Sequence, residues 1–202
     1  MPRPRVHDPD AILAAAEELL VERGRGPLTV RALTERSGAS NGTVYHAFGS
    51  LETVVATAWL RRARQFLTLQ RDAVEQAMAA GGPRRAVQAA ADAPARLAEA
   101  DLPAARLLVS LQRDDVLGDA VAPAVAVDLR ALDAALAGTL RDLAQALWDR
   151  GDAAAVDVVT LCVVRLPAAL LFDAIRAGQV PAHPRAQLAA AVGAVLDCGP
   201  TP

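Results

Sequence analysis

The stretch of residues 28–51 contains two short segments of helix-forming residues on either side of the tripeptide Ser37-Gly38-Ala39. Thr29 precedes the first segment and Ser40 precedes the second, and hydroxyl side chains at such positions cap helix N-termini. The glycine of the tripeptide can adopt the left-handed conformation that a tight turn requires. Two short helices joined in this way form a helix-turn-helix, and this layout leaves few alternatives for the N-terminal part of the chain.

The rest of the chain is also predicted to be helical. Hydrophobic residues make up 53% of the 202 residues and aromatic residues only 3%, so the core consists mainly of Ala, Leu and Val. Ala and Leu are the best helix formers, and no strand pattern is convincing. Asp8-Pro9 is a typical helix start, Ser50 can cap a long fourth helix, and Gly81-Gly82-Pro83 is the clearest linker signal. A last helix is predicted after Pro184. The fold class is therefore all-α.

The charge distribution divides the chain into two parts. The net charge is −2, and all 21 basic side chains are Arg. Residues 1–71 contain 10 Arg and 7 acidic residues, a net charge of +3, whereas residues 72–202 have a net charge of −5. A basic N-terminal unit beside an acidic body favours a DNA-binding domain over residues 1–50 and a helical domain over residues 51–202.

The most apolar segment, Val156–Ile175, has almost no polar face. Arg165 and Pro167 lie near its middle, and a charge at the centre of a bilayer is costly, so a buried helix is favoured over a membrane span. The stretch Pro184–Leu196 carries an apolar stripe at helical spacing. Burial on several sides is most simply supplied by a second copy of the chain, and we predict a homodimer through these two segments.

The residues of the helix-turn-helix fall into two groups, apolar residues that pack the helices together and small or polar residues on the second helix. Leu33, Val44 and Phe48 are predicted to pack the two helices onto the first and fourth helices. The other residues of the second helix are small or polar. They are Asn41, Gly42, Thr43, Tyr45 and His46. A capped helix with such a face is suited to enter a major groove, with its N-terminal residues at base edges and phosphates.

These residues resemble the signature of the tetracycline-repressor (TetR) family. The signature runs as Thr29-Val30-Arg31, then Ser40-Asn41-Gly42-Thr43-Val44-Tyr45, then Phe48, and the resemblance covers about residues 8–60. Two positions depart from the family pattern. Ala47 stands where the family often has His, and Leu51 stands where it commonly has a Lys that reaches a phosphate. Each departure would remove a backbone contact and lower the salt dependence of binding by about one unit of slope.

The resemblance implies which side chains contact DNA. The predicted DNA-binding residues are Thr29, Arg31, Ser40, Asn41, Gly42, Thr43, Tyr45 and His46. Asn41 is assigned to bases, with Gly42 and Tyr45 as further candidates, and Arg31 could reach either bases or phosphates. Each position also has a plain structural interpretation. Thr29 and Ser40 are helix caps in any case, Tyr45 could pack under the fourth helix, and His46 and Arg31 could be ordinary surface residues.

The resemblance also implies a C-terminal domain that dimerises and encloses a small effector, joined to the DNA-binding unit by the long fourth helix. An aliphatic lining suits a hydrophobic or acyl-like molecule better than a planar cation, because aromatic residues are scarce in this part. The candidate ligand-binding residues are Leu107, Leu108, Leu111, Leu147, Arg165 and Leu171. Arg165 could anchor an acidic group of the ligand, or could extend to solvent at the edge of a dimer interface.

Together these features predict a ligand-responsive transcription regulator, most simply a repressor. It would bind a palindromic operator in double-stranded DNA as a homodimer, and a small hydrophobic effector would release it. The alternative is a helical sensor or carrier of small molecules with a vestigial DNA-binding unit. No catalytic motif, metal-ligand spacing or cofactor motif stands out, so we expect no enzyme, metal or cofactor. A cytoplasmic protein without membrane association is expected.

Overall fold

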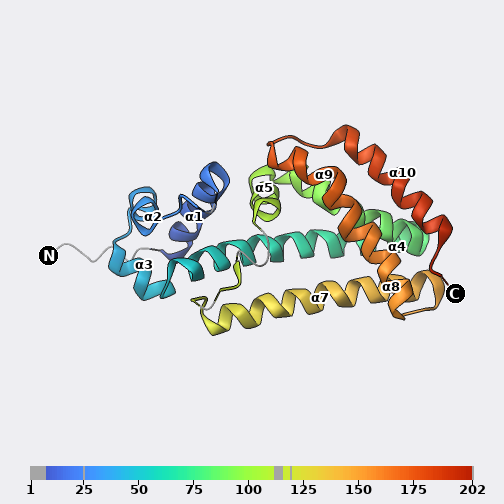
Figure 1. Ribbon diagram of the computed structural model, residues 1–202, viewed down its shortest axis with the longest axis horizontal. Coiled ribbons are helices and arrows are strands. Elements are labelled where there is room, and N and C mark those ends of the chain that lie inside the picture. The colour runs from blue at the N-terminus through green and yellow to red at the C-terminus, as the bar shows by residue number, and fades with distance from the viewer. Residues whose placement is uncertain (1–7, 25, 112–115, 119, 202) are drawn as a thin grey trace. The chain divides into compact units, whose positions relative to one another are not determined.

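The computed structural model describes residues 8–24, 26–111, 116–118 and 120–201, and these residues form helices and connecting turns without any strand (Figure 1). The all-α prediction is confirmed. The first helix, α1 (Pro9–Arg23), begins where Asp8 accepts a hydrogen bond from the Asp10 amide at 3.0 Å, and it ends at Gly24. The buried face of α1 includes Ile12, Ala16, Leu19 and Leu20.

The two helices predicted on either side of the Ser37-Gly38-Ala39 turn are present. They are α2 (Val30–Ser37) and α3 (Asn41–Phe48). Gly38 has φ 71° and ψ 6°, the left-handed conformation expected of it, and its amide donates to the Thr34 carbonyl. The chain can therefore reverse direction within three residues.

The longest helix, α4 (Leu51–Ala100), starts as predicted after Ser50, whose hydroxyl oxygen accepts the Thr53 amide at 3.0 Å. The expected linker does not end this helix. Only Gly81 and Gly82 leave helical geometry, and a second helical stretch follows at once. Gly82 has φ 76° and ψ −171°, a conformation that is accessible almost only to glycine. The pair therefore acts as a kink.

The remaining helices follow in chain order. They are α5 (Leu102–Ser110), α7 (Pro123–Trp148), α8 (Ala153–Thr160), the π-helical turn η1 (Leu161–Arg165), α9 (Leu166–Arg176) and α10 (Ala182–Cys198). The last helix begins two residues before Pro184, not after it as expected. Proline is tolerated there because amides in the first turn of a helix have no partner within the helix.

The π-helical turn η1 ends two residues before Pro167. Proline has no amide hydrogen, so the regular pattern of hydrogen bonds from residue i to residue i−4 is interrupted at this position. The chain responds with a wider turn, in which the Leu166 amide donates to the Leu161 carbonyl five residues earlier. Val164 and Arg165 in this turn are exposed, whereas Cys162 and Val163 are buried.

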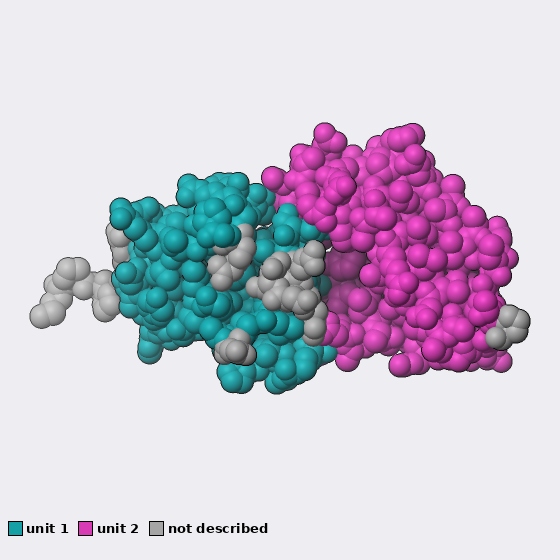
Figure 2. All heavy atoms as spheres, in the orientation of Figure 1, with its two compact units in different colours: residues 1–63, 107–130 teal, residues 64–106, 131–202 magenta. Residues whose placement is uncertain are grey.

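The chain forms two compact units, coloured separately in Figure 2. Unit 1 consists of residues 1–63 and 107–130, and unit 2 consists of residues 64–106 and 131–202. Each unit has buried side chains of its own, such as Leu33 and Val44 in the first and Leu171 and Leu188 in the second. The functional division predicted at residue 50 is a different one, and it stays a prediction.

Candidate nucleic-acid interface

The helix-turn-helix is held together by two buried side chains, Leu33 of α2 and Val44 of α3, each with 0% exposure. Phe48, the third packing residue expected from the sequence, is half-buried at the end of α3. Figure 1 shows α1, α2 and α3 grouped beside the first turns of α4. Val44 faces the core, so the residues around it on α3 face outward.

The outward face of α3 is polar. Asn41, Gly42, Tyr45 and His46 are all exposed, and the Tyr45 side chain has 53% exposure. The packing of the Tyr45 ring under the fourth helix, considered above as an alternative, is therefore not observed. Residues 41 and 45 are one helical turn apart and lie on the same face, and residue 42 lies beside them. A ligand that approaches this face meets an amide, a phenol and an imidazole with little side-chain bulk at position 42.

The N-terminus of α3 is closed by a capping interaction. The Ser40 hydroxyl oxygen accepts the Thr43 amide at 3.1 Å and lies 2.9 Å from the Thr43 hydroxyl oxygen. Thr29 caps α2 in the same way, with its hydroxyl oxygen 3.1 Å from the Ala32 amide nitrogen. Both predicted caps are confirmed. The N-terminal ends of helices attract anions such as phosphates, because their first amides point outward and the helix dipole is positive there.

Arg31 lies on α2 with its side chain 88% exposed. Its Nε is 2.8 Å from a carboxylate oxygen of Glu35 one turn later, and this hydrogen bond raises the pKa of Arg31. An exposed ion pair of this kind contributes little to folding stability, so a phosphate could take the place of Glu35 at small cost.

Other arginines of unit 1 hold the helices together. Arg36 of α2 lies 2.9 Å from Glu18 and 2.9 Å from Glu22, both on α1, and its guanidinium lowers the pKa of the Glu22 carboxyl. Arg61 and Arg62 of α4 both donate to the carboxylate of Glu17, at 2.9 Å from each Nε. Part of the excess positive charge of residues 1–71 is therefore balanced by ion pairs between these helices.

The sequence analysis did not identify Glu17 as important. Its side chain is only 8% exposed, on the same face of α1 as the apolar residues, and each of its two oxygens accepts from a different arginine. An acidic residue at an otherwise apolar position of a helix indicates a buried ion pair, and this signal was present in the sequence. The pairing fixes α4 against α1, the helix that precedes the helix-turn-helix.

The residues predicted to bind a ligand are distributed over both units. Leu107, Leu108 and Leu111 belong to unit 1, and Leu147, Arg165 and Leu171 belong to unit 2. Leu107, Leu111 and Leu171 are buried, Leu108 and Leu147 are half-buried, and Arg165 is exposed on η1. Their assignment to a binding site stays a prediction.

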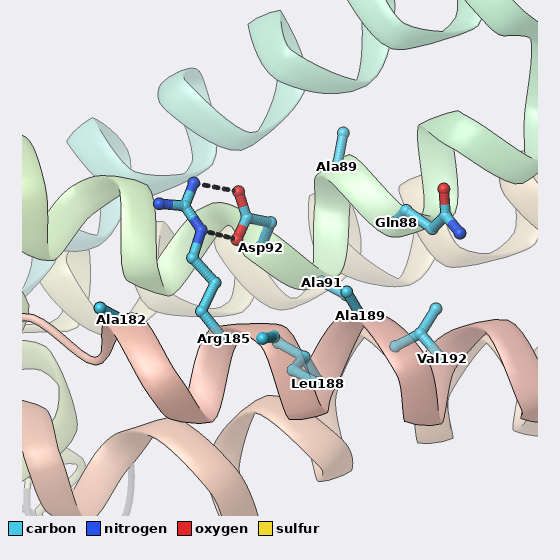
Figure 3. A pocket seen from close by; sticks show the side chains of 10 residues that line it. Gln88, Ala89, Ala91, Asp92, Ala182, Arg185, Leu188, Ala189 and Val192 are labelled. Atoms are coloured by element: carbon cyan, nitrogen blue, oxygen red, sulfur yellow. Dashed lines mark hydrogen bonds and ion pairs between the residues drawn. The ribbon is translucent and has the colours of Figure 1, made fainter.

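Unit 2 contains a groove of 520 Å³ between the second part of α4 and α10, and none of those six residues lines it (Figure 3). The walls consist mainly of alanine together with Leu188 and Val192. Arg185 crosses one end and places Nε and Nη2 each 2.6 Å from the Asp92 carboxylate, while Nη1 lies 2.6 Å from Glu99. The polar groups at this end are thus engaged with one another, and the groove presents a largely apolar surface.

Comparison with known proteins gives a family match for the N-terminal part. Residues 12–57 match the model described as bacterial regulatory proteins of the tetR family. No curated protein matches the chain.

Several solved structures share the fold. A TetR family regulator from Haloarcula marismortui is 15% identical with a TM-score of 0.69, and the match covers 96% of this chain and 98% of that one. PfmR, a TetR family transcriptional regulator from Thermus thermophilus, is 20% identical with a TM-score of 0.62, and the match covers 92% of this chain and 97% of that one. The fatty acid degradation regulator FadR from Bacillus halodurans is 15% identical with a TM-score of 0.63, and the match covers 94% of this chain and 96% of that one.

Proposed function

We propose that the chain belongs to the tetR family of bacterial regulatory proteins, whose model matches residues 12–57, and that it is a repressor that binds a palindromic operator as a homodimer and is released by a small hydrophobic effector. The observation that carries the proposal is the exposed polar face of α3 beside a capped helix N-terminus. Such a face can read base edges while the amides and hydroxyls around it bind phosphates.

Within this face, the side chains have different roles. Asn41 can form two hydrogen bonds with adenine, and Gly42 allows the helix backbone to approach the DNA closely. Thr29, Ser40, Thr43, Tyr45 and His46 contact phosphates, with Tyr45 also able to reach a base. Arg31 binds either a phosphate or a base in exchange for its surface ion pair with Glu35. Ala47 and Leu51 offer no charged group, and a shallower salt dependence of binding follows.

The proposed dimer forms through α8, η1, α9 and α10. The most apolar 18-residue stretch of Ala153–Arg176 has a mean hydropathy of 2.0, and the segment would be long enough to span a membrane, but core helices of soluble proteins have the same property. Only 33% of its most apolar stretch is buried within the chain, so much apolar surface is left for a partner. Exposed Val164 lies on this segment. A second copy would cover the surface, and a cytoplasmic protein without membrane association is consistent with this arrangement.

The proposed effector is hydrophobic or acyl-like. The candidate lining from the sequence is aliphatic apart from Arg165, which could pair with an acidic group of the ligand. We propose no catalytic activity, metal or cofactor.

A selection of fragments of genomic DNA by the purified protein tests the proposal most directly. We expect the enriched fragments to share an imperfect palindrome. The Asn41→Ala variant serves as a matched control, because its side chain is exposed and its loss leaves the helix-turn-helix core intact. The absence of any enriched sequence would contradict the proposal and favour a sensor or carrier of small molecules. Titration of the selected operator complex with fatty acids of increasing chain length then tests the effector class.

A further inference from the structure

The first turn of α4 is hydrogen-bonded to the turn that precedes α7. The Ser50 hydroxyl oxygen lies 2.7 Å from the Ala120 carbonyl oxygen and 2.9 Å from the Thr53 hydroxyl oxygen. The Ala122 amide nitrogen lies 3.0 Å from the same Thr53 oxygen. All four residues belong to unit 1.

The directions of these hydrogen bonds follow from the number of hydrogens. Ser50 has a single hydroxyl hydrogen, and the carbonyl oxygen of Ala120 can only accept, so Ser50 donates to Ala120. The Thr53 hydroxyl oxygen lies 2.9 Å from that of Ser50 and 3.4 Å from the Ala120 carbonyl oxygen, so its hydrogen has these two acceptors, while its lone pairs accept the Ala122 amide. The two hydroxyls thus connect the Ala122 amide to the Ala120 carbonyl in one hydrogen-bonded chain. Hydrogen bonds in such a chain polarise and strengthen one another.

The position of this chain connects it to the DNA-reading helix. Ser50 follows α3 after a single glycine, so the residues that hold the first turn of α4 also fix the C-terminal end of α3. Thr53 is only 5% exposed, and loss of its hydroxyl would leave the Ala122 amide without this acceptor. On the other side, the turn at Ala120 and Ala122 leads directly into α7, which begins at Pro123 and continues into unit 2.

We propose that Ser50 and Thr53 are positioning residues for operator binding. Their hydroxyls form a latch that sets the start of α4, and through it the orientation of α3, according to the conformation of the turn before α7. The two hydroxyls form hydrogen bonds only with backbone groups of that turn, so the side chains of Ala120 and Ala122 do not contribute to the latch. This inference rests on the proposed DNA-binding function and adds a route by which a change at the start of α7 alters the reading helix.

Two substitutions at one position test the latch. Thr53→Val keeps the shape of the side chain and removes the hydroxyl, whereas Thr53→Ser keeps the hydroxyl and removes a methyl group. We expect Thr53→Val to accelerate hydrogen exchange of the Ala122 amide about tenfold and to weaken operator binding by a similar factor, the value of one lost hydrogen bond. Thr53→Ser should retain operator affinity within about threefold. Wild-type operator affinity for Thr53→Val, together with faster Ala122 exchange, would overturn the proposal.

A second measurement needs no variant and covers the case in which Thr53→Val does not fold. Coupling between two sites is reciprocal, so operator DNA bound to the wild-type protein must slow the exchange of the Ala122 amide. NMR of the full-length protein with and without the selected operator measures this rate. An unchanged rate would overturn the latch alone, whereas failure to select any DNA would overturn the proposed function.

Discussion

Asn41 and Thr43 are close neighbours on α3, but their surroundings differ. The Thr43 amide and hydroxyl are both engaged with Ser40, which ties this residue to the helix N-terminus, where phosphates bind. The Asn41 side chain is exposed on the outward face of the helix. The two residues should therefore contribute differently to sequence recognition.

We expect Asn41→Ala to weaken operator binding by about 1 to 3 kcal/mol and to relax the preference at one base position in each half-site. Thr43→Ala should weaken binding to all sequences alike, because a phosphate contact has no sequence information. Repeating the DNA selection with each variant measures both effects. A motif that is unchanged for Asn41→Ala would contradict the base-reading role of Asn41.

At the level of single residues, the helix caps and the turn glycine could be predicted from the sequence. The caps at Asp8, Thr29, Ser40 and Ser50 and the left-handed Gly38 depend on neighbours within three or four positions, which the sequence shows directly. The two arginines that bind Glu17 lie 44 and 45 positions away. Such a pairing depends on how α1 and α4 pack, and this could not be read from local spacing.

Among the elements, α4 shows how a linker signal can become a kink. Gly81 and Gly82 interrupt helical geometry for two residues, and Pro83 then opens the next stretch as a residue suited to a helix start. The sequence identified the place of the interruption but not its length, because the continuation depends on packing of the second stretch.

Gly82→Ala tests the role of the kink. Alanine is strained at φ 76° and ψ −171°, so we expect a loss of about 1 to 3 kcal/mol in the free energy of unfolding. Gly138→Ala in α7 is the matched control, because a Cβ there would meet nothing within 4 Å and the residue is helical. The control should be more stable than the wild type by about 0.5 to 1 kcal/mol. Urea unfolding measures both, and a stabilised Gly82→Ala protein would show that the kink is not required.

The N-terminus of α8 has a cap that depends on pH. Asp152 accepts the amides of Ala154 and Ala155 and lies 2.7 Å from the guanidinium of Arg150. The hydrogen bond from Arg150, followed by that from Ala155, lowers the pKa of Asp152 from 3.8 to about 2. A lowered pKa means that the charged carboxylate stabilises the folded state. This stabilisation is complete above about pH 4 and disappears as the pH falls towards 2.

We therefore expect the difference in thermal stability between the wild type and Asp152→Asn to shrink between pH 4 and pH 2. Asparagine can still accept the backbone amides, so this variant isolates the charge. Melting temperatures of both proteins across this pH range are the measurement. A constant difference would indicate that the charge of Asp152 does not contribute.

For the whole molecule, oligomeric state is the main prediction. We expect sedimentation to give about twice the chain mass of 21.0 kDa at micromolar concentration, because the apolar segment from α8 to α9 is only partly buried. Val164→Asp places a charge on this surface and should weaken the dimer more than tenfold. Val127→Asp, at another exposed valine on α7, is the control and should leave the dimer intact. A dimeric Val164→Asp protein would contradict the proposed interface.

The proposed dimer also predicts the form of the operator. A twofold protein presents two copies of α3, so the half-sites should repeat with inverted symmetry about 34 to 36 Å apart, or a multiple of this distance. Full affinity for a single half-site would be inconsistent with this arrangement. The helical class of the molecule followed from composition and helix signals, whereas the proposed dimer surface of α8 to α10 depends on how two copies pack, which local sequence patterns do not specify.

Unit 1 is built from two separate stretches of the chain, residues 1–63 and 107–130. A ribosome makes these stretches in order, so the first emerges before Ala120 and Ala122 are available to Ser50 and Thr53. During that interval the hydroxyls at the start of α4 lack the Ala120 carbonyl and the Ala122 amide as partners. In a growing chain, the first turn of α4 therefore lacks these two hydrogen bonds until more than half of the protein has been translated.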